Sequence, residues 1–329
     1  MSLTANRSIV LAILAGLALC DAALAQGTRL LRRPAVSREL VAFEYGGDLW
    51  TVPRTGGQAR RLTSTPSAEI DPWFSPDGTR LAFTAAVGGN TDVYVVPVTG
   101  GEPTRLTFHP SLDAARGWSP DGSRVLYAST REIVPNPGLP SFFRLWSVAI
   151  APTGAVSAAP ELLPMPRAFT GTYSPDGRRI AYEEIGLGFA SDWAQNQSSL
   201  WRNYRGGRTR PIRVMTFAGN AVEKLPWTNS NDSSPMWVGD TVYFLSDRHG
   251  TTNLFSYRPG AKDVTALTRH DNFDIMNASA TTTPARAAAS AIASTSRTDS
   301  ASGFSQSTCL PAWHAAIVHS ACSAFGSGL

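Results

Sequence analysis

A four-residue phrase, Ser-Pro-Asp-Gly, occurs three times in this chain of 329 residues. The copies begin at positions 75, 119 and 174; an aromatic residue precedes each, and a short run of strand-forming residues follows. Proline sets φ to about −65°, aspartate accepts hydrogen bonds from the backbone that follows it, and glycine supplies a positive φ. The phrase therefore predicts a tight turn between two strands, and its recurrence predicts a repeat fold. The turn residues are Ser75, Asp77, Gly78, Ser119, Asp121, Gly122, Ser174, Asp176 and Gly177.

Flanking patterns define the rest of each repeat. Residues 41–45 and 48–52 are predicted to form two strands joined through a pair of glycines. A second Gly-Gly pair, followed shortly by Arg-Leu-Thr, stands at 56–63 and returns at 100–107. Four short strands in a unit of about 44 residues are typical of a β-propeller blade.

The later repeats diverge from this pattern. The third has a longer middle connection at 132–141, and the fourth carries the largest insertion, at about 186–210. In the fifth, Val238, Gly239 and Asp240 replace the turn phrase, and residues 270–280 are predicted to open a sixth repeat. We therefore predict an all-β propeller of four-stranded blades over residues 26–280, with about five blades plus the first strand of a sixth. Because propellers close by pairing the last blade with the N-terminal strand, we expect either an open ring or a smaller closed one.

The composition agrees with a turn-rich all-β protein. The chain is 43% hydrophobic and 16% charged, with 23 prolines and 28 glycines. Its net charge of +4 comes from scattered arginines without a run of five or six basic residues, so nucleic-acid binding is not expected. The three cysteines, at positions 20, 309 and 322, lie outside the predicted propeller, which excludes a disulfide framework or a zinc site in its core.

The two ends of the chain differ from its body. Residues 1–25 have the pattern of a secretory signal peptide: Arg7, an apolar run at 9–19, and small residues before cleavage near Ala25. That run is shorter than the roughly 20 residues that span a bilayer, so we expect export to the periplasm or the medium and no membrane span. More than half of residues 281–329 are Ala, Ser or Thr, which predicts a disordered tail or an out-of-frame sequence.

No catalytic residue, metal site or cofactor site is predicted. The Gly-x-Ser-x-Gly elbow of serine hydrolases is absent, and the turn serines recur without an accompanying histidine. The five histidines form no metal-spaced pair in the propeller. The one cluster with functional chemistry is a set of arginines in and beside the largest insertion, from which we take Arg205, Arg208 and Arg210 as candidate peptide-binding residues because guanidinium groups pair with carboxylates. A solvated loop and a docking surface for other domains are the alternatives.

A family resemblance adds to this interpretation. The segment 201–207 (Trp-Arg-Asn-Tyr-Arg-Gly-Gly), the segment 229–237 and the Gly-Asp-Leu-Trp at 47–50 resemble the N-terminal six-bladed propeller of tricorn-type proteases. The resemblance covers roughly residues 30–280. The turn phrase is less specific, because the propeller of the periplasmic protein TolB shares it.

The resemblance implies a role in proteolysis. Tricorn-type proteases are multi-domain, oligomeric serine peptidases that trim oligopeptides, in which propellers guide peptides and a PDZ-like domain lies alongside. The catalytic serine, histidine and acid are expected in other domains, so this chain alone is expected to be inactive and to contact oligopeptides or those domains. The alternatives are a stand-alone TolB-like periplasmic protein-binding propeller, and a truncated product that folds poorly.

Overall fold

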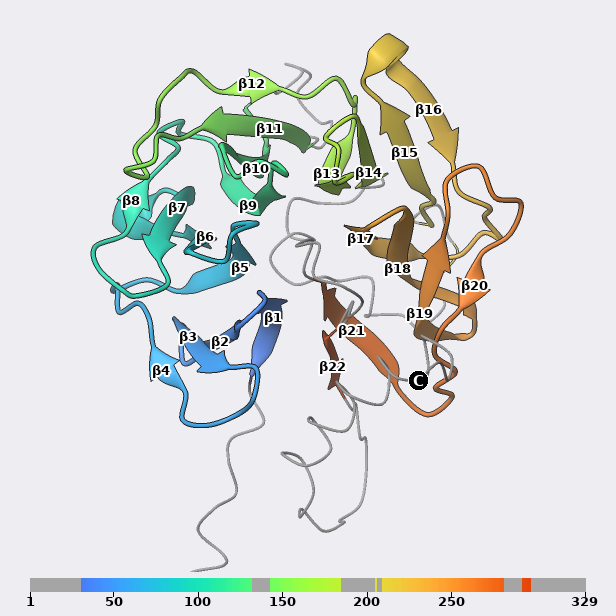
Figure 1. Ribbon diagram of the computed structural model, residues 1–329, viewed down its shortest axis with the longest axis horizontal. Coiled ribbons are helices and arrows are strands. Elements are labelled where there is room, and N and C mark those ends of the chain that lie inside the picture. The colour runs from blue at the N-terminus through green and yellow to red at the C-terminus, as the bar shows by residue number, and fades with distance from the viewer. Residues whose placement is uncertain (1–30, 132–142, 185–204, 206–208, 281–291, 297–329) are drawn as a thin grey trace, which may run out of the picture.

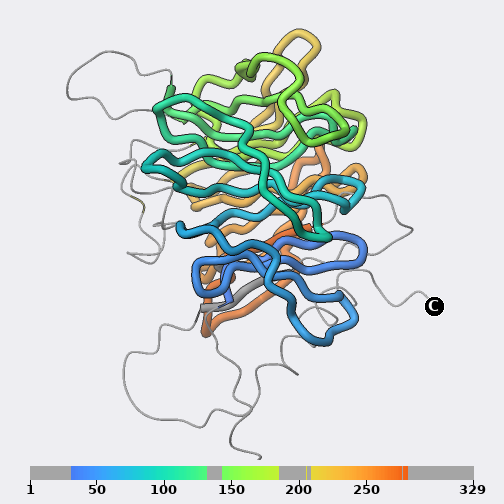
Figure 2. The backbone as a smooth tube through the Cα atoms, turned by 90° about the vertical axis from the view of Figure 1, so that its left-hand side faces the viewer, coloured from blue at the N-terminus to red at the C-terminus, as the bar shows by residue number. Residues whose placement is uncertain are grey.

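The computed structural model describes residues 31–131, 143–184, 205, 209–280 and 292–296. Five four-stranded antiparallel sheets and one two-stranded sheet surround a common axis, so the predicted all-β propeller is confirmed (Figure 1). Within each blade the strands follow one another from the axis outward in chain order. Figure 2 shows the ring from its side, where the strands run across its thickness. No helix in the described part of the chain is long and apolar enough to cross a membrane.

Each blade has long inner strands and a short outer strand. The strands are β1 (Arg32–Val36), β2 (Leu40–Tyr45), β3 (Asp48–Pro53) and β4 (Arg60–Arg61); β5 (Glu69–Phe74), β6 (Arg80–Ala85), β7 (Asp92–Pro97) and β8 (Thr104–Arg105); β9 (Asp113–Trp118), β10 (Arg124–Ser129), β11 (Arg144–Ala149) and β12 (Glu161–Leu162); β13 (Ala168–Tyr173), β14 (Arg179–Glu184), β15 (Ile212–Thr216) and β16 (Ala221–Lys224); β17 (Asp232–Val238), β18 (Thr241–His249), β19 (Thr251–Tyr257) and β20 (Thr265–Ala266); and β21 (Asp274–Ser279) with β22 (Ile292–Ser296). In the part of the chain that the structure describes, two short 3-10 helices, η2 (Val87–Gly89) and η4 (Ala218–Asn220), lie in connections.

Each Ser-Pro-Asp-Gly phrase joins the first and second strands of a blade, as predicted. In the first copy the Ser75 hydroxyl donates to Asp77 Oδ1 at 2.5 Å and accepts from the Arg80 amide at 3.0 Å. The Gly78 amide closes the turn on the Ser75 carbonyl at 2.8 Å, with Gly78 at a φ of 73°. The same hydrogen bonds recur in the copies that begin at Ser119 and Ser174. The phrase is therefore a structural turn in all three blades.

Successive turns lie against one another on one face of the ring. A β-carbon built on Gly122 would lie 3.6 Å from Cδ of Pro76, in the preceding blade's turn. One built on Gly78 would lie 3.4 Å from Cβ of Ser37, which closes the shorter first turn of the first blade. The Ser37 hydroxyl accepts from the Leu40 amide at 2.9 Å, so it performs the role of the later turn serines. The second strands β10 and β14 end at Ser129 and Glu184, on the opposite face of the ring.

The hydrophobic core lies between neighbouring blades. Blade 1 and blade 2 share a cluster that contains Leu49, Leu81 and Phe83, and blades 4 and 5 share one that contains Trp237 and Phe244. These side chains are buried, and each such burial contributes about 1.5–3 kcal/mol to the free energy of folding. Because every blade needs a neighbour on both sides, the sheets must form a ring or expose apolar faces.

The sixth sheet completes that ring. It contains β21, as predicted, and also β22, which lies in the segment that we expected to be disordered or out of frame. The sheet packs against β1 on one side and against β17, β18 and β19 on the other. In the described residues β1 pairs only with β2, so the ends of the ring meet by sheet packing and not by an exchanged strand.

Candidate functional site

All six inner strands contain an irregularity in the register with their second strand. The register shifts between Arg32 and Ala35 in β1, Ile70 and Trp73 in β5, Ala115 and Gly117 in β9, Ala168 and Thr170 in β13, Ser233 and Met236 in β17, and Ile275 and Asn277 in β21. A bulge of this kind bends a strand and redirects a side chain. The repeated bulge therefore places one extra residue of each blade where the inner strands converge (Figure 1).

Three of these bulges hold a non-glycine residue at positive φ. Arg33, Asp71 and Ser234 have φ values of 44°, 56° and 53°, and a proline follows each one. Such a conformation is unfavourable by about 1–3 kcal/mol, and residues that adopt it concentrate at functional sites. Strain repeated in three blades at one level of the axis marks that level as a candidate site.

The bulge side chains of four consecutive blades contact one another. Arg33 Nε lies 3.3 Å from Asp71 Oδ1, and Arg116 Nη1 lies 2.7 Å from Asp71 Oδ2. The Arg116 guanidinium in turn lies over the Phe169 ring, 4.3 Å from its centroid. Side chains from four successive blades meet in this way only near the axis. We call Arg33, Asp71, Arg116, Phe169 and Ser234 the axial ring.

Buried acceptors on second strands hold the bulges from behind. Glu44 of β2 accepts the Asp71 amide at 2.7 Å and pairs with Arg33 at 3.3 Å. Glu183 of β14 accepts the Ser234 amide at 2.8 Å in the same manner. In both cases the glutamate belongs to the blade before the bulge, so one blade satisfies the strained backbone of the next.

Burial shifts the titration of both glutamates. Burial raises the pKa of Glu44 to about 7, although Arg33 favours the ionised form. Burial also raises the pKa of Glu183, against the opposing effect of the Arg210 charge and the Ser234 amide. The axial site therefore combines permanently charged arginines with carboxyl groups that resist ionisation.

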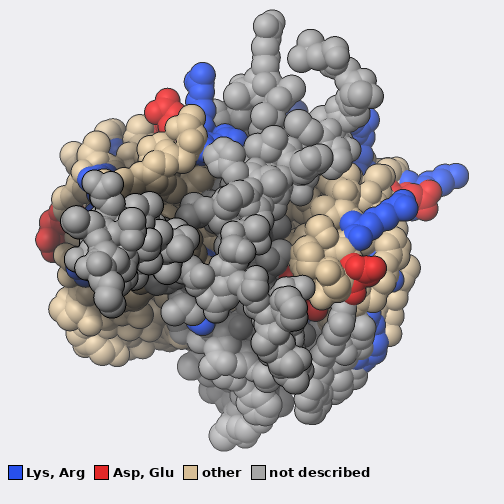
Figure 3. All heavy atoms as spheres, turned by 90° about the horizontal axis from the view of Figure 1, so that it is seen from below, with Lys and Arg blue, Asp and Glu red and all other residues tan. Residues whose placement is uncertain are grey.

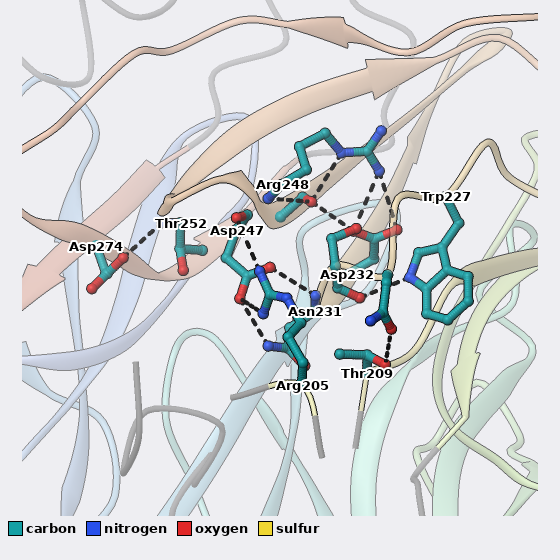
Figure 4. Close-up of polar contacts among 12 residues, drawn as sticks. Arg205, Thr209, Trp227, Asn231, Asp232, Asp247, Arg248, Thr252 and Asp274 are labelled. Carbon is teal, nitrogen blue, oxygen red and sulfur yellow. Dashed lines mark hydrogen bonds and ion pairs between the residues drawn. The ribbon is translucent and has the colours of Figure 1, made fainter. Parts of the chain in front are cut away.

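Two of the three predicted peptide-binding arginines, Arg205 and Arg210, make polar contacts in the described residues, and Figure 4 shows the contact of Arg205 with Asp247. Arg205 donates from Nη1 to Asp247 Oδ2 at 2.7 Å, and Asp247 also accepts the Asn231 amide at 2.8 Å. The Arg205 side chain is 33% exposed. Arg210 donates to the Glu184 carbonyl at 3.1 Å and carries the charge that acts on Glu183. Arg208 lies outside the described residues.

A second arginine motif nearby is structural. Arg248 pairs with the buried Asp232 at 3.1 Å, beside the Ser246 hydroxyl, and its guanidinium lies over Phe255. Blade 3 repeats the arrangement with Arg131, Asp113 and Trp146. The sequence signal is Ser-x-Arg at the end of the second strand, at 129–131 and 246–248, and no prediction was based on it. It links the second strand to the start of the inner strand within a blade.

Charged side chains elsewhere are mixed in sign. Figure 3 shows basic and acidic groups interspersed on the described part of the face seen from below. Paired examples at the surface are Arg61 with Asp48, 2.8 Å apart, and Arg258 with Asp240, 3.2 Å apart. The axial ring thus stands out by its strained backbone and by the contacts between side chains of successive blades, since ion pairs also occur at exposed positions.

Comparison with known sequences identifies one family over most of the chain. The family described as the tricorn protease N-terminal beta propeller domain matches residues 28–285. Tricorn protease homolog 1 of Streptomyces coelicolor is 32% identical over 249 residues, which cover 74% of this chain and 21% of the relative. A tricorn protease homolog of Saccharolobus solfataricus is 40% identical over 73 residues, 22% of this chain and 7% of that protein. This chain therefore spans about a fifth of the length of the Streptomyces relative.

Solved structures share the fold. The crystal structure of the tricorn protease aligns with a TM-score of 0.61 at 22% identity, covering 76% of this chain and 23% of that one. A structure described as putative TolB from Agrobacterium tumefaciens aligns with a TM-score of 0.54 at 21% identity, covering 73% of this chain and 80% of the other. The backbone of this chain therefore has the same propeller fold as these two structures.

Proposed function

Because this chain belongs to the family of tricorn protease N-terminal β-propeller domains, we propose that it binds or guides oligopeptides for a serine peptidase whose catalytic residues lie in other domains. Its own contribution is recognition and not bond cleavage. Contacts with those peptidase domains belong to the same proposal.

The pattern of residues 1–25 supports export of the protein, and N-terminal sequencing of the secreted protein should begin near Gln26. Retention of residues 1–25 would contradict export.

The observation that carries the proposal is that one arginine of the insertion, Arg210, and one of the axial ring, Arg116, both act on the buried Glu183. Arg210, from the insertion, acts on Glu183, and Glu183 holds the Ser234 bulge of the axial ring. Arg205 pairs with Asp247 of β18 in the next blade, and its side chain is still one-third exposed. A fixed guanidinium loses little conformational entropy when it binds a peptide carboxylate or carbonyl group. This arrangement supports peptide binding at the face opposite the Ser-Pro-Asp-Gly turns.

The test is binding of labelled oligopeptides to the purified chain, measured by fluorescence anisotropy. Arg205→Ala, Arg208→Ala and Arg210→Ala should each weaken binding, by about tenfold where a charged hydrogen bond to the peptide is lost. Arg258→Ala is the matched control, because Arg258 is exposed and pairs only with the exposed Asp240 in the contacts described. Unchanged affinity in all three insertion variants would remove these arginines from the peptide site. Release of product from fluorogenic peptides by the chain alone would contradict the non-catalytic assignment.

A stand-alone protein-binding propeller is the second candidate. The observation in its favour is the match to the putative TolB structure, which extends over 80% of that chain. The two functions differ in what the coding sequence encodes downstream. Peptidase domains in the same reading frame as the propeller would support the first function, and their absence in every frame would support the second.

A further inference from the structure

The axial ring contains more positive than negative charge at the level of the bulges. Two guanidinium groups, from Arg33 and Arg116, flank the single carboxylate of Asp71 at 3.3 and 2.7 Å. The other two residues of the axial ring are uncharged: Phe169 packs against Arg116, and Ser234 lies at the bulge of the fifth blade. The side chains of Arg33 and Asp71 remain 22% and 14% exposed, so both are partly accessible to solvent. Because guanidinium groups bind carboxylates bidentately, this composition suits a second carboxylate.

We propose that the axial ring selects oligopeptides with acidic side chains, whose carboxylates bind between Arg33 and Arg116. This inference rests on the proposed function, since it names the class of peptide that the propeller binds.

An unsatisfied donor supports the proposal independently. Among the described residues, Arg116 Nε is buried and has no hydrogen-bond acceptor, whereas Arg116 Nη1 binds both Asp71 and the Ala115 carbonyl. A buried donor without an acceptor is unfavourable, and native structures rarely retain one without a reason. The Phe169 ring fixes the plane of the guanidinium, so the donor keeps its direction. A ligand carboxylate that shares Arg116 with Asp71 would supply the missing acceptor.

Glu44, which lies behind the axial ring, makes the selection of acidic peptides depend on pH. Glu44 faces Arg33 from β1 and the Asp71 carboxylate and amide from β5, and Arg116 from β9 pairs with that same Asp71. Since burial raises the pKa of Glu44 to about 7, its carboxyl group is largely neutral in mildly acidic solution and competes weakly for Arg33. At higher pH the ionised Glu44 occupies Arg33, and an acidic peptide loses that partner. Acidic peptides should therefore bind more tightly below neutral pH than above it.

The experiment uses the full chain and three labelled peptides of equal length, which differ only in carrying Glu, Gln or Lys at the same positions. Anisotropy titrations are run at about pH 6 and about pH 8, on either side of the Glu44 transition. We expect the Glu peptide to bind about tenfold more tightly than the Gln peptide at the lower pH, with a smaller ratio at the higher pH. Equal binding of all three peptides would overturn the acidic selection while leaving peptide binding intact. Absence of binding by all three would contradict the proposed function itself.

Two variants with opposite expected effects separate recognition from misfolding. Arg116→Gln should abolish the preference for the Glu peptide. Asp71→Asn should increase affinity for the Glu peptide, because it removes the competing carboxylate, and asparagine tolerates the positive φ at this position. Arg258→Gln, which removes one exposed positive charge elsewhere, should change neither. Damage to the fold could weaken binding but could not produce the increase that we expect for Asp71→Asn. Binding of the Glu peptide to Asp71→Asn that is weaker than binding to the unaltered chain would overturn the proposal.

Discussion

Glu44 of β2 connects polar groups from two other strands, β1 and β5. It pairs with Arg33, accepts the Asp71 amide and remains buried, so its ionisation is opposed by burial and favoured by one cation. The result is a raised pKa, at about 7 in place of 4.5. A glutamate whose pKa rises on folding stabilises the fold below its unfolded pKa, and this contribution is lost as pH rises through the folded pKa.

The first prediction follows from this linkage. The free energy of unfolding should decrease between about pH 4.5 and about pH 7 by up to about 3 kcal/mol from Glu44, at ~1.4 kcal/mol per pKa unit. Glu44→Gln keeps an acceptor for the Asp71 amide and cannot ionise, so its unfolding free energy should depend less on pH in this window. Urea denaturation at several pH values measures both. An identical pH dependence in the variant and the unaltered chain would contradict the assignment to Glu44.

Single residues also mark the limit of inference from sequence. The turn serines were interpreted correctly, because the turn phrase acts locally: Ser119, Asp121 and Arg124 complete its hydrogen bonds within a few residues. Arg205 was identified as a candidate residue, but its partner Asp247 lies 42 positions away. Likewise Arg116 pairs with Asp71 across 45 positions. Pairs at such separations depend on how blades pack, which no local pattern specifies.

At the scale of elements, the inner strands carry a feature that a period-two pattern does not reveal. A bulge moves one residue out of the alternation, so the position that faces the axis shifts by one. The prolines at 34, 72 and 235 were the available signal, since proline inside a strand is confined to edges and bulges. The predicted strands were confirmed. The prolines indicate where the bulges lie, but the contacts between bulge residues of different blades, which define the axial ring, come only from the structure.

The link between Arg248 and Asp232 gives the second prediction, at the scale of one blade. Both side chains are buried, and the pair joins the end of β18 to the start of β17. Arg248→Met leaves the Asp232 carboxylate without its cation and should reduce the free energy of unfolding by about 3–5 kcal/mol, measured by urea denaturation.

Matched variants test whether the loss arises from the unpaired carboxylate. Adding Asp232→Asn to Arg248→Met should recover part of the stability, because an amide is less costly to bury than an unpaired charge. Arg258→Met, which breaks an exposed pair, should change stability by about 0–1 kcal/mol. If Arg248→Met and Arg258→Met had equal effects, the buried pair would not stabilise the blade as inferred.

At the scale of the whole molecule, stability depends on how the ring ends meet. Ile275 of β21 is buried in a cluster with Met236, Leu245 and Leu254 of blade 5, and the other side of the sixth sheet packs on β1. The sequence predicted β21 from its likeness to earlier inner strands. It did not predict β22, because Ile292–Ser296 lies among small polar residues without an alternating pattern that would distinguish a strand.

Truncation provides the third prediction and tests β22 directly. A chain that ends at Ser296 keeps the two-stranded sixth sheet, and one that ends at Ala280 keeps β21 without its partner. A third, ending at Asn272, removes β21 and uncovers the cluster around Leu245 and Leu254. A two-stranded sheet satisfies backbone groups that a lone strand leaves unpaired, and the buried side chains of β21 join blade 5 to the rest of the ring. The melting temperature should therefore fall in that order.

Binding of a dye specific for exposed apolar surface should rise most in the shortest chain. Circular dichroism melts of the three proteins measure the effect. Coincident melts for the chains ending at Ser296 and Ala280 would show that β22 does not stabilise the ring, and a high, cooperative melt for the chain ending at Asn272 would show that five blades form a stable propeller without the sixth sheet.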